Sequence, residues 1–378
     1  MKVALVLDRF DPHGGGLEAW TIQLAAHLLA EDHDVHVLAF EEGAHGLPVT
    51  LHRLPPHRSP IMRGRRIAAA LATLGADVVH DTGTGWSADV FHPQTGSRLA
   101  SLDREIASHT PVRRLKAALS PRTNLRRWRM AWLEARQAAR ARRLIAVSRR
   151  IRRDLAARHG VPESRIAVIP NGVDTARFAP DAIAPLRREA RRGLGLREET
   201  LFLGSAHNLR LKGMDNAIRA LAAVGGDARL ALAGGEPDAF WTGLVASLGL
   251  TERVHFLGPV ADMRPLFAAA DAYVHPTRWD ACSLSTIEAG AAGLPVITTA
   301  MNGASELITD GTTGFVLPDP EDVPALTTHM RALLDRTTRR RIGDAALAAS
   351  RGHDIRDNLR AVEAVLAEVA AERRAATS

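Results

Sequence analysis

The sequence predicts an α/β protein built from two Rossmann-like, doubly wound domains that face a cleft. Its 378 residues exceed what one hydrophobic core normally holds, so two domains are expected. The chain opens with an apolar run at residues 3–7, a glycine loop at 14–16, a helical pattern at 17–30 and a second apolar run at 35–39. Strand, loop, helix and strand in this order form a βαβ unit with parallel strands. A second series of the same kind begins near residue 201.

The remaining elements of the N-terminal half follow from the same periodicities. Along residues 17–30, the side chains of Trp20, Leu24 and Leu28 recur at helical spacing and make one apolar face. Short apolar runs with helical patterns between them predict further strands. These runs are residues 49–54, 77–80, 143–147 and 166–169.

Turn-forming residues at 170–174 (Pro-Asn-Gly-Val-Asp) then interrupt the pattern. We expect the domain junction there, with residues 180–185 as the remaining linker. The predicted domains are therefore 1–170 and 171–352. The tail, 353–378, is predicted to form a helix that packs back on the N-terminal domain.

The second half repeats the alternation of strands and helices. Its predicted strands are residues 201–204, 229–233, 254–257, 272–275, 296–298 and 315–317. Its predicted helices are residues 213–223, 238–248, 262–269, 323–334, 338–349 and 355–373.

Charge and cysteine content narrow the classes of function. The net charge is +7, but residues 111–165 hold 17 Lys or Arg against 3 acids, so the rest of the chain is mildly acidic. The single cysteine favours a reducing compartment, and we expect a cytoplasmic protein. No apolar run is long enough to span a membrane.

The segment at residues 275–306 organises the second half. Pro276 ends a strand, because proline cannot donate to a sheet, and a loop with the acid Asp280 follows. Ser285 and Glu288 then have the spacing of a capping box, with Ser285 at the N-cap. A strand that passes through a loop to a helix N-terminus is where open α/β sheets bind anions. On spacing alone, a cap beside an exposed acid and a pair of binding carboxylates are equally good readings.

A series of short motifs extends along the chain in a fixed order. They are Gly15-Gly16-Leu17-Glu18, residues 169–174, Lys212-Gly213, residues 231–235, residues 254–258, Ala269-Ala270-Asp271, His275-Pro276, Asp280 with Glu288 eight positions later, and Gly293-Leu294-Pro295-Val296. Through this series the chain resembles, over nearly its full length, the retaining GT-B glycosyltransferases of family 4, or group 1. Within that family it looks most like the lipopolysaccharide core glucosyltransferases and their relatives.

The resemblance implies a nucleoside diphosphate sugar, expected to be a UDP-hexose, bound to the C-terminal domain, and an acceptor bound to the N-terminal domain. It assigns Lys212 to the diphosphate, and Arg210 in the same loop is a further candidate. The family usually has an arginine directly after the strand-end glycine, where this chain has Ser205. Glu288 is expected to bind the ribose hydroxyls and Asp280 to face the transferred sugar.

Backbone groups are expected to complete the donor site. The N–H groups of Cys282, Ser283 and Leu284 would point at the diphosphate or the hexose. In the N-terminal domain, Gly15 and Gly16 would let the backbone approach the donor phosphate. Cys282 is expected to be a small buried residue rather than a nucleophile.

The resemblance also implies how the reaction proceeds. Family members carry a histidine of the N-terminal domain near the reacting sugar, and His92 is the first candidate, with His80 as the second. A structural histidine is the competing interpretation for both. The expected catalytic residues are therefore Asp280, His92 and Lys212. No protein nucleophile, cofactor or metal is expected, and the chain has no His/Cys cluster at the spacing of metal ligands.

The basic segment predicts a partner of its own. Arg126, Arg127 and Arg129 surround Trp128 and Trp132, which lie one helical turn apart. Such a helix suits the headgroups of an anionic inner membrane, so a peripheral position at the cytoplasmic face is expected. The same features could bind nucleic acid, or form a solvated face, but membrane contact is favoured and no nucleic-acid partner is expected.

Two classes of function remain open at this point. The first is transfer of a hexose with retention to a lipopolysaccharide-core or other glycolipid or polysaccharide acceptor. The second is a non-catalytic protein that binds an anionic surface or nucleic acid on the same fold. A sugar-nucleotide epimerase is a third possibility. The pair Asp280 and Glu288 separates them, because a simple binding protein needs neither acid.

Overall fold

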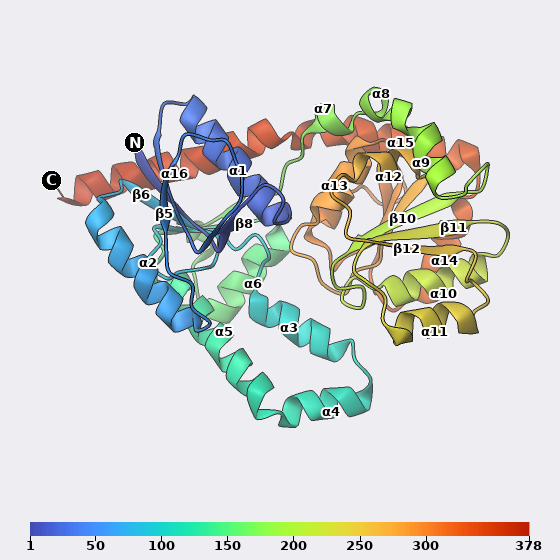
Figure 1. The fold of residues 1–378 in the computed structure, drawn as a ribbon, viewed down its shortest axis with the longest axis horizontal. Helices are drawn as coiled ribbons and strands as arrows, with labels where there is room; N and C mark the ends of the chain where they lie inside the picture. The colour runs from blue at the N-terminus through green and yellow to red at the C-terminus, as the bar shows by residue number, and fades with distance from the viewer. Residues whose placement is uncertain (378) are drawn as a thin grey trace. The chain divides into compact units, whose positions relative to one another are not determined.

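The computed structural model describes residues 1–377, which divide into two compact units. The first unit comprises Met1–Asp103, Thr110–Pro170 and the chain from Arg356 onward. The second comprises Asn171–Ile355 together with the short segment Arg104–His109. Figure 1 shows the fold.

The first unit is built on a seven-stranded parallel sheet in the order β5-β3-β1-β6-β7-β8-β9. Its strands are β1 (Lys2–Val6), β3 (Asp34–Ala39), β5 (Thr50–Arg53), β6 (Val78–Asp81), β7 (Val90–Phe91), β8 (Arg143–Ala146) and β9 (Ile166–Val168). Its helices are α1 (Gly16–Ala30), α2 (Pro60–Leu74), α3 (Arg98–Ala107), α4 (Pro111–Leu119), α5 (Pro121–Arg140), α6 (Arg149–His159) and α16 (Ile355–Thr377). Two further short strands, β2 (Arg9–Phe10) and β4 (Glu41–Glu42), pair beside the sheet.

The second unit is built on a six-stranded parallel sheet in the order β12-β11-β10-β13-β14-β15. Its strands are β10 (Leu201–Ala206), β11 (Arg229–Gly234), β12 (Val254–Gly258), β13 (Ala272–His275), β14 (Val296–Thr299) and β15 (Gly314–Leu317). Its longer helices are α9 (Arg187–Gly193), α10 (Met214–Val224), α11 (Ala239–Ser247), α12 (Arg264–Ala269), α13 (Leu284–Ala291), α14 (Val323–Ala332) and α15 (Arg336–Ser350). Helices α10, α11 and α14 cover one face of this sheet, and α9, α12, α13 and α15 cover the other (Figure 1).

Both sheets confirm the predicted fold class, two Rossmann-like α/β domains. The predicted linker at residues 180–185 is wrong. Those residues form the short helix α8 (Pro180–Ile183) and a 3-10 turn, η2 (Ala184–Leu186), which pack against α12 within the second unit. Ile183 is buried there, so apolar packing gives the segment a fixed place despite its prolines. Strand β7 has only two residues, too few for the periodicity of the sequence to reveal.

Helix α16 belongs to the first unit and is anchored there by polar contacts. The indole N–H of the buried Trp20 donates to Asn358 Oδ1 at 2.8 Å, and Asn358 Nδ2 donates to the carbonyl of Pro170 at 2.6 Å. The carboxylate of Glu363 bridges His27 and His33 at 2.8 and 2.9 Å. Among residues 1–377, no helix is both long enough and apolar enough to cross a bilayer.

Candidate functional site

Polar loops gather where three neighbouring strands of the second sheet end. Strands β10, β13 and β14 lie side by side in the strand order, and because they are parallel their carboxyl ends share one edge. The loops after them carry Lys212, Asp280 and Asn302. Gly213 allows two of these loops to touch, because a Cβ there would lie 2.0 Å from the carbonyl oxygen of Pro276, and its φ is +67°. Glycine is therefore required beside Lys212.

Lys212, Asp280 and His275 form the centre of this edge. Lys212 Nζ lies 2.5 Å from Asp280 Oδ2 and 3.1 Å from the carbonyl oxygen of Trp279. His275 Nε2 lies 3.2 Å from the same oxygen of Asp280. Burial raises the pKa of the Asp280 carboxyl, but the Lys212 ammonium and the hydrogen bond from His275 outweigh it and hold that pKa well below its usual range. Asp280 is therefore ionised at neutral pH.

The backbone of Asp280 is also held on both sides. Its N–H donates to the carbonyl of Met301 at 3.0 Å, and its own carbonyl accepts from Gly303 N–H at 3.0 Å. The buried amide of Asn302 between them donates to Thr286 Oγ1 and Thr298 Oγ1 and accepts from Ser283 N–H. This network fixes the loop after β13 against the loop after β14.

Arg278 is a structural residue of the site that the sequence reasoning did not assign. Its guanidinium is buried and pairs with Asp215 at 2.7 Å and with Glu321 at 2.5 Å. It also donates to the carbonyl of Arg210 at 2.6 Å, and its backbone N–H donates to the carbonyl of Leu211 at 2.9 Å. Arg278 thus holds the loop that presents Lys212. The role of this arginine is recognisable only once the fold brings the buried Asp215 to it.

The N-terminus of helix α13 differs from the prediction. The N-cap is Ser283, whose hydroxyl accepts from Thr286 N–H at 3.2 Å, so the capping box with Ser285 at the N-cap is wrong. The hydroxyl of Ser285 instead lies 2.7 Å from the buried hydroxyl of Tyr273, which lies 3.1 Å from Ser205 Oγ. A serine at position 205 thus completes a buried hydroxyl chain that supports the N-terminus of α13.

Glu288 lies in the second turn of α13, outside any cap. Its carboxyl group is partly buried, and among residues 1–377 it has no hydrogen-bond or ion-pair partner. Burial raises the pKa of Glu288 to about 7, with the charge of Arg177 acting in the opposite direction. A partly buried carboxyl group without a partner is costly unless a ligand satisfies it, so Glu288 is a strong candidate for a ligand contact.

The other residues predicted to contact the donor make contacts within the protein or are partly buried. The guanidinium of Arg210 stacks on the ring of Phe240 at 4.2 Å. The prediction that the backbone N–H of Ser283 faces a ligand is wrong, because that N–H donates to Asn302 Oδ1 at 3.2 Å. Cys282 is buried, and its carbonyl accepts from Asn171 Nδ2 at 2.8 Å. Leu284 opens helix α13 and is partly buried.

In the first unit, the glycine loop folds over one acidic side chain. Gly15 has a φ of +146° and precedes helix α1. A Cβ at Gly14 would lie 2.8 Å from Glu18 Cγ, and one at Gly15 would lie 2.9 Å from Glu18 Oε2. The helix itself begins at Gly16. These glycines therefore make room for Glu18, besides leaving the backbone uncovered.

His92 and His80 lie together beneath the surface of the first unit. His80 Nε2 is 3.2 Å from His92 Nδ1, and the ring of Trp20 meets His92 edge-on at 5.0 Å. Both imidazoles are fully buried, which lowers the pKa of His80 to about 4 and that of His92 well below its ordinary value. Both are therefore neutral at pH 7. With no exposed surface, His92 does not reach a substrate in this conformation, and its assignment stays a prediction.

The basic segment folds into helices α4 and α5 with an unpartnered apolar surface. Trp128 is 58% exposed, with the exposed Arg126 and Arg129 on either side, whereas Arg127 pairs with Asp103 at 2.9 Å. Trp132 does not share the outward face of Trp128. Its ring packs edge-on against Trp86 at 5.4 Å, with Arg136 over both rings. Trp132 is therefore partly buried by its packing within the first unit, and its contact with a membrane stays a prediction.

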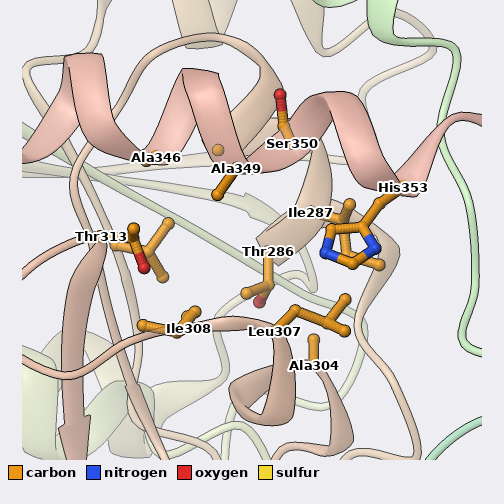
Figure 2. Close-up of a pocket in the computed structure, with 12 residues that line it drawn as sticks. Thr286, Ile287, Ala304, Leu307, Ile308, Thr313, Ala346, Ala349, Ser350 and His353 are labelled. Carbon is orange, nitrogen blue, oxygen red and sulfur yellow. The ribbon is translucent and has the colours of Figure 1, made fainter.

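A cavity of the second unit lies behind α13, between that helix, the 3-10 turn η3 (Gly303–Leu307) and α15 (Figure 2). Its empty volume is about 370 Å³. Most of the lining side chains are small and apolar, and His353 is the only titratable residue among them. Without an acid or an ammonium group, this cavity lacks the chemistry found at the strand ends.

Two family models match consecutive parts of the chain. Residues 14–177 match the model "Glycosyltransferase Family 4", and residues 197–336 match the model "Glycosyl transferases group 1". Together the two models take in most of both units. The chain belongs to the group 1 glycosyltransferases.

Particular members of this glycosyltransferase family are similar in sequence and in fold. A GDP-mannose-dependent alpha-(1-6)-phosphatidylinositol monomannoside mannosyltransferase of Mycolicibacterium smegmatis is 36% identical over 245 residues, which are 61% of this chain and 62% of the relative. The lipopolysaccharide glucosyltransferase WaaG of Escherichia coli is 31% identical over 178 residues, 46% of this chain and 48% of WaaG. The matched stretches thus span about half to three fifths of these relatives.

Solved structures extend the likeness in fold to nearly the full chain. The crystal structure of WaaG superimposes with a TM-score of 0.80 over 96% of this chain and 99% of WaaG, at 23% identity. Anabaena HepE in complex with UDP and glucose superimposes with a TM-score of 0.74 over 97% of this chain and 100% of HepE, at 21% identity. The glycosyltransferase therefore has the GT-B fold.

Proposed function

We propose that this glycosyltransferase moves a hexose, with retention of configuration, from a nucleoside diphosphate sugar to a lipopolysaccharide-core or other glycolipid or polysaccharide acceptor. The observation that carries the proposal is the arrangement at the end of the second sheet. There Lys212 and Asp280 lie beside each other at the strand ends, and Glu288, on the adjoining helix, has no partner among the residues that the structure describes. A cation beside acids that accept hydroxyl hydrogen bonds suits a ligand with both phosphates and sugars.

Each group has a part in this chemistry. The Lys212 ammonium would neutralise the diphosphate, and Glu288 would accept hydrogen bonds from the ribose hydroxyls. The acceptor oxygen forms its bond to the anomeric carbon as the bond from that carbon to the diphosphate oxygen breaks, on the same face of the sugar. The acceptor proton passes to the departing diphosphate. Positioning and the positive charge of Lys212 would supply the catalysis, without a protein nucleophile, cofactor or metal.

The donor base and sugar are proposed to be uridine and glucose. The fold of HepE, seen with UDP and glucose, supports this choice, whereas the mycobacterial relative is named for GDP-mannose. A thermal-shift screen of UDP-, GDP- and ADP-sugars is therefore the decisive experiment. We expect one donor series to raise the unfolding temperature, and UDP-glucose to raise it most. Absence of any shift, together with absence of transfer to a glycolipid acceptor, would overturn the proposal, and donor turnover without acceptor would indicate an epimerase.

We also propose that helices α4 and α5 bind the cytoplasmic face of an anionic membrane, where a glycolipid acceptor would lie. In α4, Val112, Leu115 and Leu119 are each more than 60% exposed and recur at helical spacing. The basic residues Arg113, Arg114 and Lys116 alternate with them. An exposed apolar stripe flanked by basic side chains is suited to the interface of an anionic bilayer. No tryptophan at position 132 is needed for this surface.

Vesicle binding tests the membrane proposal. Replacing Leu115 and Leu119 together by aspartate should abolish binding to vesicles that contain phosphatidylglycerol, because it removes apolar area and adds repulsive charge. Replacing the partly exposed Leu248 by aspartate, in the second unit, serves as the matched control and should leave binding unchanged. Binding of the parent protein should weaken as salt rises. Equal binding to neutral vesicles, or binding unaffected by the double substitution, would contradict the proposal.

A further inference from the structure

His275 is a buried group of the site to which the proposed reaction assigns no part. It ends strand β13, its side chain is 2% exposed, and its Nε2 lies 3.2 Å from Asp280 Oδ2. The other ring nitrogen, Nδ1, is buried and has no partner among residues 1–377. Only one protonation state fits these surroundings. A neutral imidazole with its proton on Nε2 donates to Asp280 and leaves the buried Nδ1 unprotonated, so that no N–H lacks an acceptor.

One carboxylate oxygen of Asp280 accepts two hydrogen bonds. His275 Nε2–H and the Lys212 ammonium both converge on Oδ2, and the ammonium approaches more closely, at 2.5 Å. Side chains of both charged residues are mostly buried, at 20% exposure for Lys212 and 16% for Asp280. The negative charge of Asp280 therefore offsets the positive charge that a diphosphate would need. An anionic donor has to compete with Asp280 for Lys212.

We propose that donor binding exchanges the partners of Lys212, and that His275 is the positioning residue that makes the exchange possible. Before the donor binds, Asp280 holds the Lys212 ammonium. When the diphosphate takes Lys212, the Asp280 carboxylate keeps the hydrogen bond from His275 and becomes available to the hydroxyls of the hexose. Without His275, the buried Asp280 carboxylate would lose Lys212 to the diphosphate and would not keep the hydrogen bond from the imidazole. Burying a charge with less compensation is costly. The inference rests on the proposed function, because it concerns the same donor.

The affinity for UDP alone tests this exchange, because UDP has the diphosphate but no hexose. We expect Asp280→Asn to tighten UDP binding by up to about 10-fold, since it removes the competing charge. A residue that contacted only the sugar would leave UDP affinity unchanged. We expect His275→Leu to weaken UDP binding by about 10-fold, and His275→Gln, which keeps an N–H near the same position, to restore most of it. In turnover, Asp280→Asn should lower kcat even as UDP binds more tightly.

A double-mutant cycle completes the test. If His275 acts through Asp280, the double variant His275→Leu with Asp280→Asn should bind UDP as tightly as Asp280→Asn alone. His255→Leu, a partly buried histidine of β12 in the same sheet, is the matched control and should leave UDP affinity unchanged. Calorimetry with UDP, and with GDP in a parallel series, measures the parent protein and the five variants, and their unfolding temperatures confirm that they are folded.

The outcomes separate this inference from the proposed function. Parent protein that binds neither UDP nor GDP would overturn both. Parent protein that binds a nucleotide, combined with unchanged or weaker binding by Asp280→Asn, would overturn the exchange alone. Additive effects of the two substitutions, or no rescue by His275→Gln, would likewise remove His275 from this role.

Discussion

Replacing Glu288 by glutamine is expected to weaken donor binding by about 10-fold or more. The carboxylate has no partner in the described part of the chain and could accept from two ribose hydroxyls, whereas the amide oxygen of glutamine accepts fewer and its NH₂ group repels a donor. Titration with UDP measures the loss. Glu252→Gln, at an exposed carboxylate of the same unit, is the matched control and should bind UDP like the parent protein.

The pH dependence of binding provides a second measure of the same contact. Because burial raises the pKa of Glu288 to about 7, the group is increasingly protonated, and a poorer acceptor, as the pH falls below that value. UDP affinity should therefore rise with pH and level off above about pH 7, with at most a tenfold change for each pH unit below it. Glu288→Gln should remove this dependence. An equally steep profile in the variant would show that another group is responsible.

Replacing Arg278 by leucine is expected to destabilise the second unit by about 3–5 kcal/mol and to abolish donor binding. The guanidinium is the main partner of the buried Asp215, and it also holds the carbonyl of Arg210 in the loop that presents Lys212. The substitution would leave Asp215 buried with less compensation and would release that loop. Thermal unfolding and UDP titration measure the two effects.

Arg264→Leu is the matched control for this prediction. Arg264 also pairs with an aspartate, Asp262 at 2.7 Å, but both side chains are more than one third exposed, so solvent screens the pair and little change is expected. The stability of the Arg278→Lys variant should lie between those of the Arg278→Leu and Arg264→Leu variants. Lysine keeps the charge but not the forked geometry that reaches Asp215 and Glu321 together. Equal stability of the Arg278→Leu and Arg264→Leu variants would contradict the structural role of Arg278.

Local patterns predicted the fold well because the buried strands of parallel sheets leave clear apolar runs. The strands at residues 272–275 and 296–298 were predicted to within one residue of β13 and β14. Failures arose where a few residues depend on distant partners. Strand β7 is too short for any periodicity, and the prolines at 180 and 185 indicated a linker although Ile183 is buried within the second unit.

In the candidate site, too, local patterns predicted some side chains, whereas contacts with distant residues decided the others. Motif spacing selected Lys212, Asp280 and Glu288, because those residue types occur at strand ends and at the start of a helix. The N-cap was misplaced by two residues, since Ser283 and Ser285 are both good caps and only the surroundings choose between them. Ser285 points to Tyr273 instead, a residue twelve positions earlier on a neighbouring strand. Trp132 packs on Trp86 in the same way, against a residue far away in sequence.

By itself, the sequence determined the two parallel sheets, the basic segment and the acids and lysine of the site, because periodicity, composition and turn chemistry are local properties. The tertiary structure decided which of these groups meet. It placed Asp280 beside Lys212 and His275, buried Arg278 between Asp215 and Glu321, and left Glu288 without a partner among residues 1–377. The cluster around Arg278 joins Asp215 and Glu321, which are 106 positions apart in the sequence. Such contacts depend on strand order, which no local pattern encodes.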